Sequence, residues 1–217
     1  MILAAGRGER MRPLTDATPK PLLAVHGQPL IERHVINLAR AGFERVVINL
    51  AWLGAQIREF LGDGTRYGAS IVYSDEGPRA LETAGGIFNA LPLLPPGPFA
   101  VVNGDIYTDF PFATLKLDKR HDAHLVMVPN PSYLRGDFAI EAGEARSSGH
   151  PTYTYCGIAM YRPEFFAGCV QGAFPAKPLM VRSMDAGRCS AELYPGLWED
   201  VGTPERLAVL NAQAVRA

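Results

Sequence analysis

The chain has 217 residues, of which 47% are hydrophobic and 20% charged, a composition typical of a globular protein with one sizeable core. Its formal net charge of −1 gives no general attraction to nucleic acid or to an anionic membrane surface, and we expect neither as a partner. The three widely spaced cysteines predict free thiols in a reducing compartment. Because no apolar run could span a bilayer, the sequence predicts a soluble cytoplasmic protein with a single domain over residues 1–217.

In the first half of the chain, short apolar runs alternate with segments of helical period, which is the pattern of an α/β domain with a largely parallel sheet. The expected elements are a strand at 1–4, a helix at 28–41, a strand at 45–50, a helix at 53–61, a strand at 70–74, a helix at 83–91 and a strand at 99–103. His34 falls on the apolar face of the first helix. The run 99–103 is apolar on both faces, so we expect it at the centre of the sheet.

Strands predominate after Gly104, and we expect them to form a small strand-rich insertion beside the sheet edge. The expected elements are strands at 125–129, 138–141 and 153–161, a glycine- and serine-rich turn at 143–149, a helix at 177–187, a short strand at 197–201 and a closing helix at 203–216. Thr203 is the expected N-cap of that last helix, with Pro204 in its first position.

The first strand leads into a loop with two glycines and two arginines, LAAGRGERM from Leu3 to Met11. Glycine lets backbone N–H groups converge on phosphate oxygens and arginine can contact two oxygens at once, so the loop indicates an anion site. It is neither the dinucleotide fingerprint, whose third glycine is replaced by Met11, nor a P-loop. An ordinary tight turn remains an alternative. Lys20, held between Pro19 and Pro21, favours the phosphate site because its charge is rigidly placed.

Two aspartates lie at the ends of expected strands, at the edge where ligands of α/β sheets collect. Asp105 comes directly after the central strand, and Asp200 lies in the run WEDVGT. Mg²⁺ favours one or two carboxylates together with substrate phosphates, so these residues are candidate ligands. Asp105 could instead be a turn residue, and Asp200 a turn or helix-capping residue. We find no histidine ligand spacing and no Ser/His/Asp or Cys/His nucleophile, which fits phosphoryl-type transfer, where the protein mainly positions charged groups.

Taken together, these motifs resemble the sugar-1-phosphate nucleotidylyltransferase family over essentially the whole chain. The run LAAGRGERMRPLT…TPKPL from Leu3 to Leu22 is similar to a long and specific family signature. Three further runs occur in the family's order: ETAGG at 82–86, NGD at 103–105 and WEDVGT at 198–203. The resemblance implies a Rossmann-like, GT-A-like three-layer α/β/α fold with a mixed, mostly parallel central sheet and a small strand-rich sugar-binding insertion.

Four runs resemble one branch of the family: INLAWLG at 48–54, LETAGGI at 81–87, NGDIYTDF at 103–110 and RGDF at 135–138. This branch transfers UMP from UTP to N-acetylmuramic acid 1-phosphate, giving UDP-N-acetylmuramic acid and pyrophosphate in peptidoglycan recycling. A mannose-1-phosphate guanylyltransferase shares the catalytic motifs and remains an alternative. So does a catalytically inactive nucleotide-sensing subunit. We expect a monomer or a small homo-oligomer.

The resemblance also implies roles for individual residues. The nucleotide would be bound by Ala4, Ala5, Gly6, Gly8, Glu9, Arg10, Lys20 and Gly85. Asn103 and Asp137 would contact the sugar, with Glu82 as a further candidate, while Asp105 and Asp200 would bind Mg²⁺ as the cofactor. The catalytic residues would be Arg10, Lys20 and Asp105. The Glu-Lys-Pro motif with which many relatives hold the sugar phosphate is not evident, and Arg135 is our candidate replacement.

Overall fold

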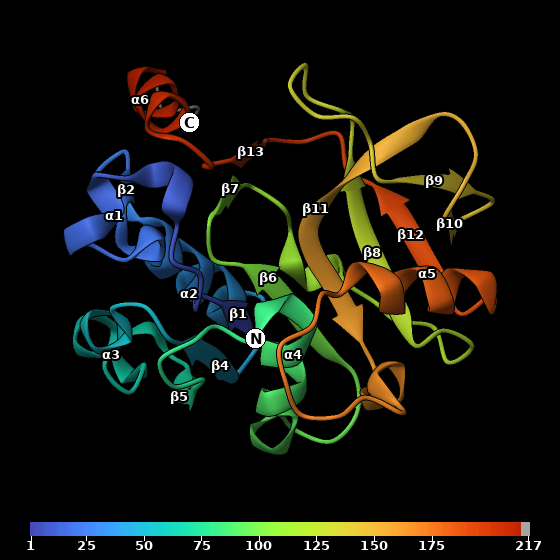
Figure 1. The fold of residues 1–217 in the computed structure, drawn as a ribbon, viewed down its shortest axis with the longest axis horizontal. Coiled ribbons are helices and arrows are strands. Elements are labelled where there is room, and N and C mark those ends of the chain that lie inside the picture. The colour runs from blue at the N-terminus through green and yellow to red at the C-terminus, as the bar shows by residue number, and fades with distance from the viewer. Residues whose placement is uncertain (214–217) are drawn as a thin grey trace.

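Nine strands form the main sheet of the computed structural model, which describes residues 1–213 (Figure 1). They are β1 (Ile2–Leu3), β4 (Arg45–Leu50), β5 (Ser70–Asp75), β6 (Phe99–Asn103), β8 (Ala123–Val128), β9 (Phe138–Glu141), β10 (Glu144–Arg146), β11 (Thr152–Tyr161) and β12 (Cys189–Leu193). Their order across the sheet is β5-β4-β1-β6-β11-β8-β12-β10-β9. Two small pairings lie beside it, joining β2 (Ala24–Val25) to β3 (Gln28–Pro29) and β7 (Ile106–Thr108) to β13 (Trp198–Asp200).

The α-helices are short and separated by strands or turns. They are α1 (Leu14–Ala17), α2 (Leu30–Arg40), α3 (Gly54–Leu61), α4 (Glu82–Ala90), α5 (Lys177–Asp185) and α6 (Pro204–Ala212). Short 3₁₀ helices occur at η1 (Glu9–Met11), η2 (Lys20–Leu22), η3 (Thr65–Tyr67), η4 (Leu91–Leu93), η5 (Phe112–Thr114) and η6 (Pro163–Phe166). Within residues 1–213, none of the helices combines the length and the apolar character needed to cross a membrane.

The sheet buries side chains on both faces, as the side chains of β4, which point to alternate faces, show. Val46 and Ile48 belong to a buried cluster that includes apolar residues of α2 and α3. Val47, between them in sequence, belongs to a second cluster that includes residues of α4 and α5. Helices therefore pack against the two faces of the sheet, and the carboxyl ends of β1 and β6 remain available for a site.

The structure confirms the expected succession of strands and helices in the first half of the chain, and β4 and β6 have the expected bounds. It corrects the organisation of the second half. Strands β8 to β12 continue the main sheet instead of forming a separate insertion, because β11 pairs with β6 on one side and β8 on the other. The sheet has four parallel and five antiparallel pairings, so it is mixed and not mostly parallel.

Several short elements differ from the expectation. The presumed turn at 143–149 contains strand β10, which pairs with β9 and β12, and β7 and β12 were not expected. At α6 the expected start is confirmed, since Thr203 Oγ1 accepts a hydrogen bond from the Arg206 N–H at 3.4 Å and Pro204 occupies the first position. The helix ends at Ala212, and the expected helical positions 214–216 lie outside the described residues.

His34 links α2 to the strand that follows Asp105. Its ring lies in the core, and Nε2 is 2.9 Å from the Ile106 carbonyl oxygen, so the neutral ring donates from Nε2. Nδ1 has no partner among the described residues. Burial lowers the pKa of His34 from 6.5 to about 4, because a charged imidazolium would lose its hydration in this position.

Acidification should therefore weaken the fold through His34. The unfolded chain takes up this proton near pH 6.5 and the folded chain near pH 4, so the stabilisation is complete above pH 6.5 and is lost as the pH falls toward 4. We expect the free energy of unfolding of the wild type to fall by about 3 kcal/mol more than that of His34→Gln over this range. Urea denaturation at several pH values measures the difference. If the free energies of unfolding of the two proteins fell equally with pH, this prediction would be wrong.

Candidate active site

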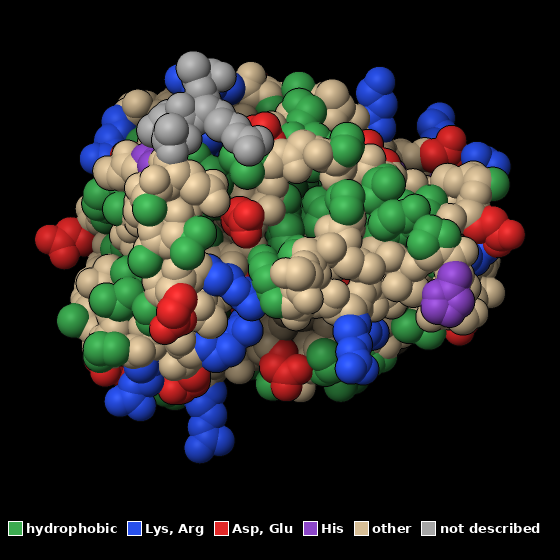
Figure 2. All heavy atoms as spheres, turned by 90° about the horizontal axis from the view of Figure 1, so that it is seen from above, with side chains coloured by type: hydrophobic (Ala, Val, Ile, Leu, Met, Phe, Trp, Pro, Cys, Tyr) green, Lys and Arg blue, Asp and Glu red, His purple; other side chains and the backbone are tan. Residues whose placement is uncertain are grey.

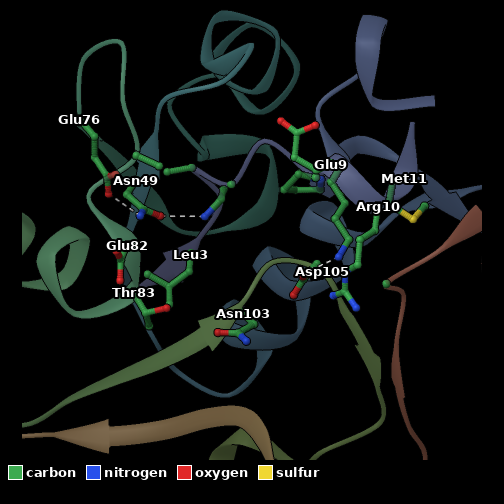
Figure 3. Close-up of a pocket in the computed structure, with 18 residues that line it drawn as sticks. Leu3, Glu9, Arg10, Met11, Asn49, Glu76, Glu82, Thr83, Asn103 and Asp105 are labelled. Atoms are coloured by element: carbon green, nitrogen blue, oxygen red, sulfur yellow. Dashed lines mark hydrogen bonds and ion pairs between the residues drawn. The ribbon is translucent and has the colours of Figure 1, made fainter. Parts of the chain in front are cut away.

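A cavity of about 380 Å³ lies at the carboxyl ends of β1 and β6, between the N-terminal loop and the start of α4. Its walls are formed by Leu3, Ala4, Ala5, Gly6, Gly8, Glu9, Arg10, Met11, Lys20, Pro21, Asn49, Glu76, Ala80, Glu82, Thr83, Asn103, Asp105 and Gly202. Figure 3 shows Arg10 and Asp105 at one end and Glu76, Asn49 and Glu82 at the other. In the space-filling view the surface is hollowed between the two halves of the molecule, and basic side chains gather on one side of this hollow (Figure 2).

The N-terminal loop curls around a glycine that no other residue could replace easily. Gly8 has a φ of +68°, and a Cβ there would lie 3.1 Å from the Thr15 side chain and 3.2 Å from that of Lys20. Thr15 Oγ1 donates a hydrogen bond to the Gly8 carbonyl, which fixes the turn. Glu9 and Arg10 follow on the cavity wall and are exposed there. The loop thus places backbone and one arginine on the cavity wall, and its role as an anion site stays a prediction.

Arg7, the other arginine of the loop, has a different role. Its guanidinium donates to the Thr15 carbonyl and to Asp16 Oδ1, both at 2.7 Å. It also stacks on Trp52, with 3.9 Å between the guanidinium carbon and the ring centroid. Arg7 therefore ties the loop to neighbouring segments and does not line the cavity.

Lys20 and Asp105 form an ion pair on the cavity wall. Lys20 Nζ lies 2.6 Å from Asp105 Oδ2, although the two residues are far apart in the sequence. Lys20 is only 7% exposed, held by the turn that begins at Pro19, while Asp105 keeps about a third of its side chain accessible. A buried lysine beside an accessible carboxylate can exchange that carboxylate for a phosphate at little cost in hydrogen bonds.

Asp200 reaches the same region through a strand pairing. It lies opposite Ile106 in the β13–β7 pair, and the Val201 N–H donates to the Asp105 carbonyl at 3.2 Å. Asp200 is not among the residues that line the cavity. Its Oδ2 pairs with Arg206 Nη1 at 2.7 Å. Each of the two expected metal ligands thus has a basic partner. No group of three or more His, Cys, Asp or Glu side chains arranged to hold a metal is found within residues 1–213.

A relay of hydrogen bonds connects β1, β4 and the segment before α4. Asn49 Oδ1 accepts from the Ala4 N–H, and Asn49 Nδ2 donates to Glu76 Oε1, both at 2.7 Å. Glu76 Oε2 in turn accepts from the Leu81 N–H at 2.6 Å. These hydrogen bonds fix the segment before α4 relative to β1 and β4, and they occupy the N–H group of Ala4.

Gly85 is the expected nucleotide-binding residue that the structure places away from the cavity wall. Its N–H donates to the Phe174 carbonyl at 3.1 Å, and the Ala84 N–H donates to the same oxygen. A Cβ at Gly85 would lie 2.2 Å from the Gly172 carbonyl oxygen. The need for glycine here thus arises from close packing of α4 against the segment 172–174.

The expected sugar residues are divided between the cavity wall, which Glu82 also lines, and a position outside it. Asn103 lines the cavity at the end of β6, whereas Asp137 lies outside the cavity wall at the start of β9. Asp137 Oδ2 accepts from the Tyr155 N–H at 3.1 Å, and Oδ1 lies 3.4 Å from Lys177 Nζ. Arg135 is exposed and does not line the cavity.

Comparison with known proteins agrees with this geometry. The family model for nucleotidyl transferases matches residues 1–132, a range that contains every residue of the cavity wall except Gly202. The chain is 48% identical to N-acetylmuramate alpha-1-phosphate uridylyltransferase of Neisseria meningitidis, covering 99% of this chain and 97% of that protein. The chain belongs to the nucleotidyl transferase family.

Two further relatives extend the comparison. The Caulobacter vibrioides protein of the same name is 33% identical to this nucleotidyl transferase, covering all of this chain and 97% of that one. A solved Bacillus anthracis protein, assigned as a glucose-1-phosphate thymidylyltransferase, superposes with a TM-score of 0.84 at 22% identity, covering 97% of this chain and 92% of that one. It shows that the fold is an α/β nucleotidyltransferase fold.

Some residues of this nucleotidyl transferase site were missed from the sequence, although weak signals exist for two of them. Asn49 is a polar residue in the otherwise apolar strand RVVINL. Gly157 is an isolated glycine within the strand TYTYCGIAMY, which indicates a bulge or a close approach. The structure shows both a bulge and a close approach at Gly157. The β11–β8 register shifts between Tyr155 and Ile158, and a Cβ at Gly157 would lie 2.6 Å from Asn103 Nδ2. The sequence gives no signal for Lys177, the partner of Asp137.

Replacing Gly157 by alanine should disturb Asn103 and weaken the fold. The φ of +83° is strained for alanine, and the added methyl group would displace the Asn103 side chain from the cavity wall. Gly143→Ala is a matched control, because Gly143 has the same φ of +83° with nothing within 4 Å. We expect Gly157→Ala to unfold with about 1–3 kcal/mol less free energy than Gly143→Ala. Its KM for the sugar substrate should rise about 10-fold. Equal values for both variants would show that Gly157 does not position Asn103.

Proposed function

We propose that this chain transfers UMP from UTP to N-acetylmuramic acid 1-phosphate, releasing pyrophosphate and UDP-N-acetylmuramic acid, as in peptidoglycan recycling. The observation that carries the proposal is the cavity in which the glycine-arginine loop faces the Lys20–Asp105 pair. The full-length similarity to the Neisseria and Caulobacter enzymes supports the choice of substrates. UTP and this sugar phosphate are cytoplasmic compounds in bacteria, so we infer that the chain acts in the cytoplasm.

The residues of the cavity would divide the two substrates between them. The loop from Gly6 to Arg10 would hold the triphosphate, with Arg10 stabilising the charge that develops on pyrophosphate as it leaves. Lys20 would offset the repulsion between the triphosphate and the sugar phosphate, because its position between two prolines fixes its charge near both. Asn103 and Asp137 would orient the sugar ring.

The phosphate oxygen of the sugar would act as nucleophile on the α-phosphorus of UTP, so the protein needs no nucleophile of its own. The two buried cysteines agree with this role. Burial raises the pKa of Cys189 to about 12 and that of Cys156 further still, so neither thiol ionises near neutral pH. Catalysis would come from positioning the two substrates in line and from neutralising their charge.

Asp105 and Asp200 would hold a Mg²⁺ ion. The donor set fits, since Mg²⁺ takes one or two carboxylates and completes its shell with water and substrate phosphates. The pairing of β7 with β13 brings the two residues to adjacent backbone positions, and Gly202 beside Asp200 lines the cavity. When bound, the ion would supply charge stabilisation to the reacting phosphates. Lys20 and Arg206, the present partners of the carboxylates, would neutralise them before the ion and nucleotide enter.

We also infer the finer description of the fold, a Rossmann-like domain of three layers. Two buried clusters support it, one joining the sheet to α2 and α3 and the other joining it to α4 and α5. In this description the strands β8 to β12 would form the sugar side of the cleft, as part of the main sheet.

Pyrophosphate release by the purified protein tests the proposal. UTP and GTP would each be combined with N-acetylmuramic acid 1-phosphate and with mannose 1-phosphate, in the presence and absence of Mg²⁺. We expect rapid release only with UTP, N-acetylmuramic acid 1-phosphate and Mg²⁺. Preferred use of GTP and mannose 1-phosphate would show a guanylyltransferase instead, and no release with any pair would indicate a nucleotide-sensing subunit.

A further inference from the structure

Lys177, the first residue of α5, lies beside the sugar-contacting candidate Asp137. Its Nζ is 3.4 Å from Asp137 Oδ1. Asp137 is itself held firmly, since its other oxygen accepts from the Tyr155 N–H at 3.1 Å and its own N–H donates to the Tyr153 carbonyl at 2.7 Å. One oxygen of the Asp137 carboxylate is thus bound to the backbone of β11, and the other holds the Lys177 ammonium group in place.

Strand β11 links this ion pair to the cavity. Gly157 of β11 contacts Asn103 on the cavity wall, and Tyr155, which anchors Asp137, lies two residues before it. Two residues span at most about 7 Å of chain, and less where β11 is irregular as it is here, so one hexose ring with its substituents can bridge the separation. A sugar that contacts Asn103 on one edge can therefore reach Asp137 and Lys177 on the other.

The backbone that carries Lys177 is also fastened to the cavity wall. The Phe174 N–H donates to the Leu81 carbonyl at 3.2 Å, and the Phe174 carbonyl accepts from the first turn of α4. Figure 1 shows the segment that precedes α5 passing in front of α4. Glu82 and Thr83 of the same turn line the cavity, so Lys177 follows closely after a segment fixed to that wall.

The side chains of the cavity wall carry more negative than positive charge, and the proposed Mg²⁺ ion would act on the reacting phosphates. Four carboxylates line the cavity, those of Glu9, Glu76, Glu82 and Asp105, against only two basic side chains, Arg10 and Lys20. Both basic side chains are assigned to phosphate groups in the proposed reaction. A sugar that carries an additional carboxylate would be repelled here unless another positive charge met it.

We infer that Lys177 binds the lactyl carboxylate of N-acetylmuramic acid 1-phosphate and so selects an acidic sugar over neutral ones. The inference rests on the proposed function. An ammonium group has three donors, of which one is directed at Asp137, so two remain for a carboxylate. The Lys177 side chain is 63% exposed and can adjust its reach, whereas Arg135 makes no hydrogen bond or ion pair with Asp137 among the described residues.

The test compares two substrates that differ only in this charge, N-acetylmuramic acid 1-phosphate and its lactamide. The wild type should prefer the carboxylate in kcat/KM. In Lys177→Met we expect this preference to fall about 10-fold, through a higher KM for the carboxylate substrate, with the KM for UTP unchanged. Lys177→Arg should keep most of the preference. The exposed Lys116 provides the matched control, and Lys116→Met should behave as the wild type, while Arg135→Met tests the competing candidate.

Each other outcome overturns the inference. A wild type without preference for the carboxylate, an unchanged preference in Lys177→Met, or an equal loss on both substrates would show that Lys177 does not recognise this group. Loss of the preference in Arg135→Met alone would assign the role to Arg135. If the wild type formed no UDP-sugar from N-acetylmuramic acid 1-phosphate, the proposed function itself would fail and the inference with it.

Discussion

Asp105→Asn should lower kcat for UDP-sugar formation about 1000-fold, even with saturating Mg²⁺ and substrates. The substitution keeps the size of the side chain but removes the negative charge that faces Lys20 at 2.6 Å and that would hold the metal ion. Losing a metal-positioning carboxylate costs several kcal/mol of transition-state stabilisation, which corresponds to this decrease in rate. Steady-state rates of pyrophosphate release at increasing Mg²⁺ concentrations measure the effect.

Asp118→Asn is the matched control for this experiment. Asp118 is half exposed, pairs with Arg120 on the surface and does not line the cavity. Its replacement should leave kcat within about twofold, as most surface substitutions have little effect. Near-wild-type turnover by Asp105→Asn, with a normal thermal unfolding curve, would remove Asp105 from the catalytic machinery.

Lys20→Met should lower kcat between about 100- and 1000-fold, the range observed when one preorganised donor to a developing charge is removed. Methionine fills a similar volume, so the main change is the loss of the ammonium group in a position that is only 7% exposed. Asp105 keeps solvent access and should tolerate the loss of its partner. Lys20→Arg should not restore the rate, because the side chain packs closely against Gly8 and a branched guanidinium needs more room.

The exposed Lys116 again provides the comparison, since Lys116→Met removes the same charge outside the cavity. We expect its kcat to match that of the wild type. If kcat of Lys20→Met fell by less than about threefold, Lys20 would have no direct role in the reaction, because a group that neutralises the reacting phosphates must affect the rate more strongly.

The centre of the site could be predicted from the sequence because short-range motifs specify it. The glycine-arginine loop and Lys20 lie within the first 20 residues, and Asp105 follows an apolar run that could only be a central strand. Their meeting follows from general geometry, since β1 and β6 are parallel neighbours whose carboxyl ends meet at one edge. The structure brings Lys20 and Asp105 into direct contact.

The outer parts of the site depend on contacts that no motif encodes. Gly85 stands in a family motif, yet its neighbour is the segment 172–174, whose path depends on the packing of the whole second half. Lys177 meets Asp137 because tertiary packing brings the start of α5 beside this residue, and neither local sequence shows it. The strands β8 to β12 were predicted in part as strands, but their partners follow from tertiary packing, which a period of two does not specify.

The account requires that Asp105 and Asp200 act on one ion beside a nucleotide held by the loop from Gly6 to Arg10. A crystal structure with Mg²⁺, a non-hydrolysable UTP analogue and N-acetylmuramic acid 1-phosphate tests this most directly. We predict a metal ion bound between the two carboxylates, with phosphate oxygens in its shell and the triphosphate along the loop. A nucleotide bound elsewhere, or carboxylates that keep Lys20 and Arg206 as their only partners in that complex, would contradict the account.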